Sequence, residues 1–161
     1  MAVCSNLLQG QSSEWALIKR HPCEDLFGIQ LCCSNADLAG RCAKLLENET
    51  EFDFLDLNAG CPIDVVYSKG CGAALLERPK RIGEILKSMK SATSRDVSVK
   101  LRIGKDEKNP TIDKQVIPFL KEWGARFATI HGRSRLQRYA KLADWNYIKT
   151  CVDVAKKDSI P

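Results

Sequence analysis

Strand-like and helix-like segments alternate along this chain, and this alternation limits its possible folds more than any other feature. The strand-like segments lie near residues 1–4, 26–31, 54–57, 97–102 and 126–130. Between them, apolar residues recur at helical spacing near residues 14–18, 38–46, 82–89, 112–120 and 145–152. Such alternation predicts parallel strands that are joined by helical crossovers.

Two arrangements of about five parallel strands satisfy this pattern: an open doubly wound sheet and part of a (β/α)8 TIM barrel. The Gly-x-Gly-x-x-Gly fingerprint of dinucleotide-binding sheets is absent from the sequence, which favours the barrel. A complete barrel usually takes about 250 residues, whereas this chain has 161. We therefore expect residues 1–161 to form one incomplete α/β domain, a partial barrel that lacks its N- and C-terminal parts.

Three local signals predict where helices begin and bend. Ser12 or Ser13 can cap a short helix over residues 14–18, and Asp144 can cap the last helix. Pro118 lies inside the predicted helical segment 112–120 and should kink that helix.

Composition excludes several classes of protein. The chain is 44% hydrophobic and 28% charged, has no run of about 18 apolar residues and shows no signal peptide, so we expect neither a membrane span nor secretion. It holds eight cysteines but no Cys-x-x-Cys, and it has only two histidines, which fits neither a zinc finger nor a disulfide scaffold. We expect reduced thiols that mostly fill the core, no structural metal, and a location in the cytoplasm, with the nucleus as a second compartment.

The segment Phe54–Pro62 resembles a buried strand that stops abruptly at a thiol. Gly60 and Pro62 flank Cys61 and prevent both strand and helix from continuing through it. Taken alone, Cys61 is more simply explained as a buried structural thiol. At the carboxyl end of a parallel strand, it would instead lie where α/β enzymes have their active sites.

Polar residues stand at the ends of four predicted strands. They are Gln30, Asn58 with Cys61, Lys100 with Arg102, and His131 with Arg133. Each has an ordinary alternative as a hydrogen-bonded core residue or a solvated strand end. Because the carboxyl ends of parallel barrel strands meet on one face, their joint occurrence predicts a single functional site.

These strand ends carry three motifs that resemble the tRNA-dihydrouridine synthases. The motifs are Asn58-Ala59-Gly60-Cys61-Pro62, Lys100-Leu101-Arg102-Ile103-Gly104 and His131-Gly132-Arg133. The segments Leu7–Leu17 and Ala143–Trp145 are most similar to the eukaryotic branch that modifies the tRNA variable loop. The resemblance extends over essentially the whole chain.

The resemblance implies a flavoprotein that uses FMN and NADPH to reduce the C5–C6 bond of uridine in tRNA. By matching position, Cys61 would be the general acid that protonates C5 after the reduced flavin delivers hydride to C6. Gln30, Lys100 and His131 match the FMN contacts of the family. Free thiols titrate near pH 8.5, so a protonated thiol is available as an acid at neutral pH.

The resemblance also implies a face that binds tRNA. Asn58 matches the residue that holds the uracil edge, and Arg102 and Arg133 lie near the same face. The run 133–141 contains four positive charges and no acid, and these are Arg133, Arg135, Arg138 and Lys141. Such a run is either a solvated loop or a contact for tRNA phosphates, with Tyr139 available to stack on a base.

Two other functions are compatible with these residues. The chain could be an inactive truncated product that retains only tRNA contacts, because it lacks the family's first strand region and later phosphate-binding elements. We therefore expect weak FMN binding and little activity from residues 1–161 alone. It could also be a flavin barrel of the dihydroorotate or dihydropyrimidine dehydrogenase type, although the basic run favours a polymeric substrate.

Overall fold

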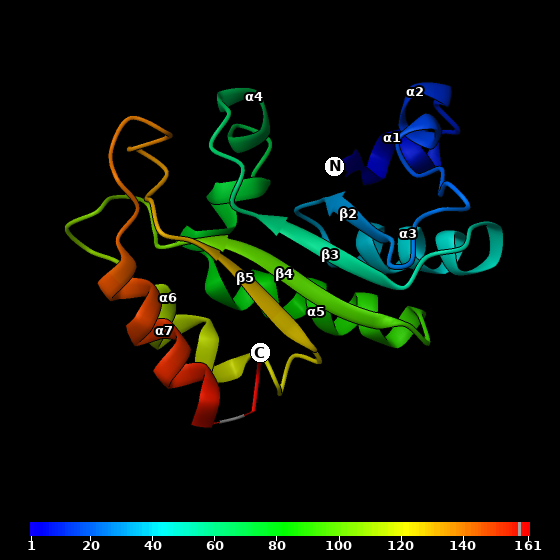
Figure 1. Ribbon diagram of the computed structural model, residues 1–161. Helices are drawn as coiled ribbons and strands as arrows, with labels where there is room; N and C mark the ends of the chain where they lie inside the picture. The colour runs from blue at the N-terminus through cyan, green and yellow to red at the C-terminus, as the bar shows by residue number, and fades with distance from the viewer. Residues whose placement is uncertain (158) are drawn as a thin grey trace.

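The computed structural model describes residues 1–157 and 159–161, and it contains one parallel sheet of five strands (Figure 1). Each strand pairs in parallel with the strand that precedes it in sequence. All strands therefore have their carboxyl ends at the same edge of the sheet. The strands are β1 (Ala2–Val3), β2 (Gly28–Cys32), β3 (Phe54–Ala59), β4 (Asp96–Arg102) and β5 (Phe127–His131).

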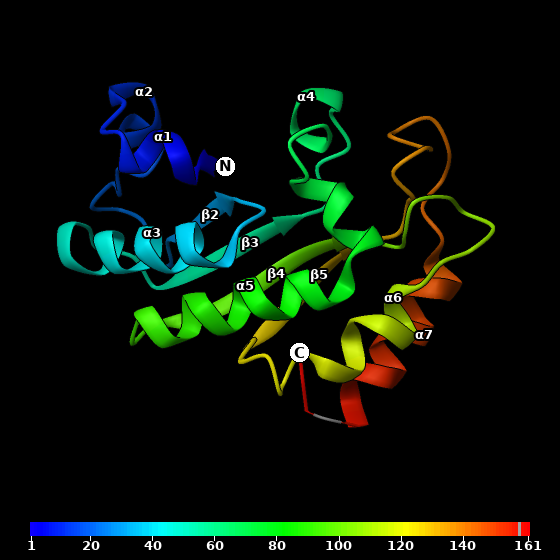
Figure 2. The ribbon, with the colours of Figure 1, turned by 180° about the vertical axis from the view of Figure 1, so that it is seen from behind.

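The strand order identifies the sheet as an arc of a (β/α)8 barrel. A doubly wound sheet reverses its strand order at a switch point, whereas this sheet runs β1-β2-β3-β4-β5 without a reversal. Right-handed crossovers that always advance in one direction place their helices on one face of the sheet. Helices α3 (Ala36–Glu49) and α5 (Pro79–Ala92) lie side by side on that face, as Figure 2 shows. The predicted α/β class and partial barrel are confirmed.

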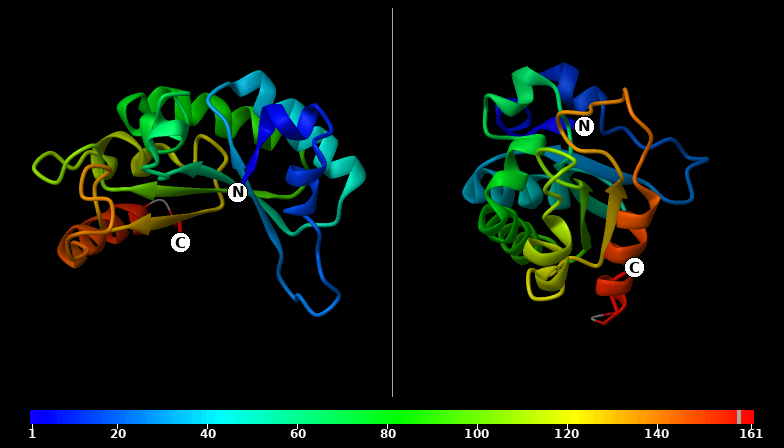
Figure 3. Two further views of the ribbon diagram at one scale, coloured as in Figure 1. Left: turned by 90° about the horizontal axis from the view of Figure 1, so that it is seen from above. Right: turned by 90° about the vertical axis from the view of Figure 1, so that its left-hand side faces the viewer.

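The remaining helical elements are short, apart from the last one. They are α1 (Cys4–Leu8), α2 (Ser12–Ala16), α4 (Asp64–Tyr67), η1 (Gly72–Glu77), α6 (Ile112–Gln115), η2 (Ile117–Phe119) and α7 (Trp145–Lys157). Seen from above, the connection between α2 and β2 extends away from the side that α3 and α5 cover (Figure 3).

The three local signals have different outcomes. The Asp144 carboxylate accepts a hydrogen bond from the Tyr147 N–H at 2.9 Å, so the predicted cap of α7 is confirmed. The predicted serine cap is wrong, because α2 begins at Ser12 itself after Gln11, and no side chain caps it. Pro118 breaks the helical segment rather than kinking it, since Val116 leaves the helical region and a 3₁₀ turn follows.

Strands β3 and β4 each have an apolar face and a mostly polar face. Successive side chains of a strand point to opposite faces, and on β3 and β4 one set consists of Leu55, Leu57, Val97, Val99 and Leu101, all 0% exposed within the hydrophobic core. The alternate set consists of Asp56, Asn58, Ser98, Lys100 and Arg102. The first set stabilises the layer between sheet and helices, and the second lines the inside of the arc.

Most thiols belong to the core, as expected from their abundance. Cys4, Cys32, Cys33, Cys42, Cys71 and Cys151 are buried, whereas Cys61 is half-buried and Cys23 is exposed. Within residues 1–157 and 159–161, no helix is long and apolar enough to cross a membrane. The same part of the chain contains no group of three or more histidine, cysteine or acidic side chains arranged to hold a metal ion.

Candidate functional site

The polar strand ends come together in one pocket at the carboxyl edge of the sheet. Its volume is about 190 Å³, and its lining comes from β2, β3, β4, β5 and the loops that follow β3 and β5. A larger hollow of about 450 Å³ lies between loops 106–109 and 136–141, but none of the strand-end residues lines it. The smaller pocket is lined by Gln30, Asn58, Gly60, Cys61, Pro62, Lys100, Arg102, His131 and Tyr139. The strand ends therefore converge in space as expected, except that Arg133 does not line the pocket.

The backbone on both sides of Cys61 is fixed by hydrogen bonds. The Asn58 side-chain oxygen accepts from the N–H groups of Gly60 and Cys61, at 3.2 and 2.9 Å. The Cys61 carbonyl accepts from the Ala73 N–H at 2.9 Å. Gly72 has a φ of +60°, and a Cβ at this position would lie 2.7 Å from the Cys61 carbonyl oxygen, so the close approach requires glycine.

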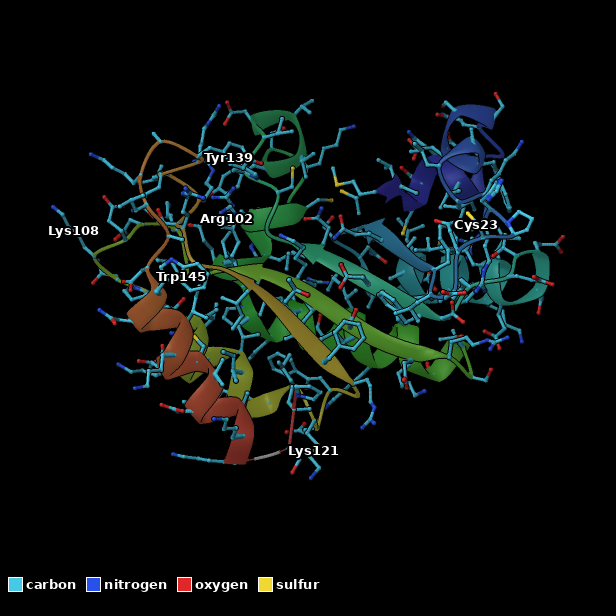
Figure 4. All side chains as sticks on the ribbon, viewed as in Figure 1. Cys23, Arg102, Lys108, Lys121, Tyr139 and Trp145 are labelled. Atoms are coloured by element: carbon cyan, nitrogen blue, oxygen red, sulfur yellow. The ribbon has the colours of Figure 1, made fainter. Side chains whose placement is uncertain are left out.

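Arg102 is a buried cation that joins two loops of the site. Figure 4 shows Arg102 and Tyr139 close together, and the Arg102 guanidinium carbon lies 5.1 Å from the centre of the Tyr139 ring. Arg102 is only 1% exposed. Its Nε donates to the Gly60 carbonyl at 2.8 Å, and its Nη1 donates to the carbonyls of Ser134 at 2.9 Å and Arg138 at 2.7 Å. Arg102 thus attaches the loop after β5 to the loop that carries Cys61.

The tautomer of His131 is set by its neighbour Arg133. The Arg133 Nη1 lies 3.0 Å from His131 Nε2. Because a guanidinium can only donate, Nε2 must accept, and the ring proton of the neutral imidazole lies on Nδ1. Burial lowers the pKa of His131, and the positive charges of Arg102, Lys100 and Arg133 lower it further.

We expect the His131 ring to titrate below the ordinary imidazole value of about 6.5. The folded state resists protonation while the unfolded state accepts it, so the stability that His131 contributes is present above pH about 6.5 and is lost as the pH falls through the lowered folded pKa. NMR titration of the His131 ring carbons measures the midpoint. Arg133→Gln should raise it only in part, because burial is the larger cause. A midpoint at or above that of free imidazole would contradict the expectation.

Two of the predicted tRNA-contacting arginines lie outside the pocket and bind Asp64 of α4. Arg135 Nη2 and Arg138 Nη2 lie 2.8 and 2.7 Å from the two Asp64 carboxylate oxygens. The Arg135 guanidinium also covers the Tyr67 ring, with its carbon 3.8 Å from the ring centre. Figure 3 shows the loop after β5 folded beside α4. The Arg138 guanidinium, followed by the Arg135 guanidinium, lowers the pKa of Asp64.

Two buried polar residues beneath the pocket were not identified by the sequence analysis. Asp56 is 8% exposed and Ser98 is 0% exposed. Asp56 lies two residues before Asn58 on β3, so the period of a strand places both on the same face. That spacing is the signal that could have identified Asp56 from the sequence.

The thiol of Cys61, the ammonium group of Lys100 and the neutral imidazole of His131 thus line one pocket at the carboxyl edge of a parallel (β/α) barrel arc. This combination defines an α/β-barrel protein with its candidate active site at the carboxyl ends of the strands.

The comparison with known families agrees with this class. The model of the dihydrouridine synthase (Dus) family matches residues 6–159, so the chain belongs to that family. The resemblance noted from the three motifs is therefore confirmed.

Curated relatives place the chain near one eukaryotic branch of the family. It is 50% identical over 155 residues to a Homo sapiens protein named tRNA-dihydrouridine(47) synthase [NAD(P)(+)]-like, with 96% of this chain and 24% of the relative covered. It is 48% identical over 155 residues to an Oryza sativa subsp. japonica protein of the same name (96% and 22%). It is 41% identical over 162 residues to tRNA-dihydrouridine(47) synthase [NAD(P)(+)] of Cryptococcus neoformans (98% and 22%). The chain thus spans about a quarter of the length of these relatives.

Proposed function

We propose that this chain forms the part of a tRNA-dihydrouridine synthase that provides the catalytic acid. The reaction would reduce the C5–C6 bond of uridine in tRNA, with FMN as the bound cofactor and NADPH as the electron donor. The observation that carries the proposal is the meeting of Cys61, Lys100 and His131 in one pocket of a chain that belongs to this family. The names of the relatives, which include both tRNA and NAD(P)(+), support it.

The polar lining of the pocket suits FMN, which would supply hydride chemistry when bound. Gln30 and Lys100 offer an amide and an ammonium group, and the neutral His131 ring offers a donor at Nδ1. An ammonium group at this position would stabilise negative charge on a reduced flavin ring. The fit of these donors to an anionic planar ring is the reason to assign FMN to this pocket.

Cys61 would transfer its thiol proton to C5 of the uracil ring. Protonation there completes the saturation of the double bond, and the fixed backbone around Cys61 holds the thiol ready for this step. The Asn58 Nδ2 donates to the Met1 sulfur at 2.8 Å. Because a thioether is a weak acceptor, a uracil carbonyl could take its place. Asn58 would thereby contact the uracil edge.

The loop after β5 would contact the tRNA backbone near the pocket. The Arg138 side chain remains 55% exposed although it pairs with Asp64, and Tyr139 is 69% exposed. Arg133 and Arg135 would contribute positive charge beside them. Arg102 would hold this loop in place through its hydrogen bonds to the loop's carbonyl groups. We propose the cytoplasm or nucleus, where tRNA is present, as the location.

The proposal is tested with the intact gene product, FMN, NADPH and tRNA that lacks dihydrouridine. We expect NADPH oxidation coupled to dihydrouridine formation and tRNA binding that weakens steeply with salt. Oxidation coupled only to a free pyrimidine would favour a dehydrogenase of the dihydroorotate type. Binding of tRNA without flavin absorbance would favour an inactive product that retains only tRNA contacts.

A further inference from the structure

A series of hydrogen-bonded side chains, all buried except the half-buried Gln30, connects the interior of the arc to Cys61. At its inner end, Asp56 accepts hydrogen bonds from Ser98 Oγ and Gln30 Nε2, both at 2.7 Å. The Gln30 Oε1 in turn accepts from Asn58 Nδ2 at 3.0 Å. The Asn58 oxygen then accepts from the Cys61 N–H at 2.9 Å. Four hydrogen bonds thus connect Ser98 on β4 to the backbone of the proposed catalytic residue.

The two ends of this series determine the direction of every hydrogen bond within it. A backbone N–H such as that of Cys61 can only donate, and an ionised carboxylate such as that of Asp56 can only accept. The amides of Gln30 and Asn58 lie between these ends and can each be turned either way. With Asp56 ionised, only one orientation of both amides satisfies all partners, and it directs the Asn58 oxygen at the Cys61 N–H.

The Asp56 carboxyl group has two hydrogen-bond donors and one positive charge around it. Burial raises the pKa of Asp56, but the hydrogen bonds from Gln30 and Ser98 and the positive charge of Lys100 act in the opposite direction. The net effect is a raised pKa, and when Asp56 is ionised it accepts from these two donors near the ammonium group of the pocket.

We propose that Asp56 is a positioning residue that orients the Gln30 and Asn58 amides and thereby fixes the backbone of Cys61. Its catalytic consequence rests on the proposed function, because only a synthase would use the thiol of Cys61 as an acid. The hydrogen-bond geometry itself is a property of the protein without cofactor or tRNA. Failure of the two proposals can therefore be told apart.

The substitution Asp56→Asn tests the direction of the hydrogen bonds between Asp56 and Cys61, and it hardly changes the volume of the side chain. An asparagine can donate as well as accept, so the Gln30 amide can turn over, and the Asn58 amide can follow it. In the turned state, the Asn58 NH₂ group would face the N–H groups of Gly60 and Cys61, and both would lose their acceptor. Hydrogen exchange at these amides should become roughly tenfold faster.

A second change should restore the lost acceptor. In the double variant Asp56→Asn/Asn58→Asp, the acceptor-only carboxylate is moved next to the Cys61 N–H. Gln30 can then donate to Asp at position 58 and accept from Asn at position 56, so every partner is again satisfied. A role of Asp56 that depended only on packing would not be restored in this way.

The experiment is hydrogen–deuterium exchange with mass spectrometry on the intact gene product without ligands, at about pH 8, which lies well above the ordinary carboxyl pKa and favours the ionised form of Asp56 despite its raised pKa. Asp53→Asn is the matched control, because Asp53 accepts from the Phe27 N–H at the opposite end of β3. We expect faster exchange in residues 58–62 for Asp56→Asn, recovery in the double variant and no change there in the control. Unchanged exchange in Asp56→Asn, or no recovery in the double variant, would overturn the proposal.

Activity provides a second readout for the same variants. In the flavin-loaded Asp56→Asn protein, kcat for dihydrouridine formation should fall by about 10- to 100-fold, because the thiol is misplaced and the Asn58 amide is turned. KM for tRNA should change by less than about threefold, because the arginines of the loop after β5 are unchanged. If Asp56→Asn does not fold, Gln30→Met breaks the same series and should speed exchange in residues 58–62. A Gln30→Met protein with unchanged exchange there would overturn the proposal as well.

Discussion

Replacement of Cys61 by alanine is expected to reduce dihydrouridine formation by about 10²- to 10⁴-fold, the usual contribution of a positioned acid or base. The loss arises because no other thiol lines this pocket in the described part of the chain. FMN binding should persist, since Gln30, Lys100 and His131 are unchanged. Single-turnover assays with tRNA measure product formation, and flavin absorbance measures retained cofactor.

Two cysteine variants make this experiment specific. Cys61→Ser retains the size of the side chain but is a much weaker acid, so it should resemble Cys61→Ala. Cys23→Ala is the matched control, because Cys23 is exposed and lies far from the pocket, as Figure 4 shows. Full product formation by Cys61→Ala would remove Cys61 from the mechanism.

Replacement of Arg102 by methionine is expected to destabilise the protein by about 3–5 kcal/mol. The substitution leaves the carbonyls of Gly60, Ser134 and Arg138 without their donor in a buried region. A loss of this size corresponds to a decrease in Tm of roughly 6–20 °C for a domain of this length. Thermal unfolding followed by circular dichroism measures it.

The control for Arg102 is another arginine with little structural role. Arg126→Met removes an exposed ion pair with Asp96 at 3.9 Å, so it should change stability by less than about 1 kcal/mol. Arg102→Lys should recover only part of the stability, because one ammonium group cannot reach three carbonyls in the geometry of a guanidinium. A Tm for Arg102→Met equal to that of Arg126→Met would show that the three hydrogen bonds contribute nothing.

Much of the fold and the location of the site could be predicted from local sequence. The alternation of segments indicated parallel strands, and the polar residue at each strand end indicated the face on which they meet. Cys61 could be singled out because Gly60 and Pro62 leave it no regular structure. These signals are local, since each depends on residues only a few positions apart.

The partners of the site residues could not be predicted in this way. Asp64 binds arginines that are 71 and 74 residues away in sequence, and nothing near Asp64 indicates them. Arg102 could be taken for a solvated strand end, because its carbonyl partners belong to two separate loops. The local pattern of segments is the same for a barrel arc and a doubly wound sheet, so the prediction of a barrel depended on the absent Gly-x-Gly-x-x-Gly fingerprint, and the strand order confirmed it.

The two faces of the strands have a consequence for how this family can diverge. On β3 and β4, the residues that hold the sheet to its helices alternate with those that line the pocket. A substitution at a pocket-lining position other than Arg102, which also joins two loops, therefore leaves the contacts between sheet and helices intact. Preferences for a particular uridine or nucleotide donor could change through these positions over evolutionary time, while the surrounding scaffold keeps its shape.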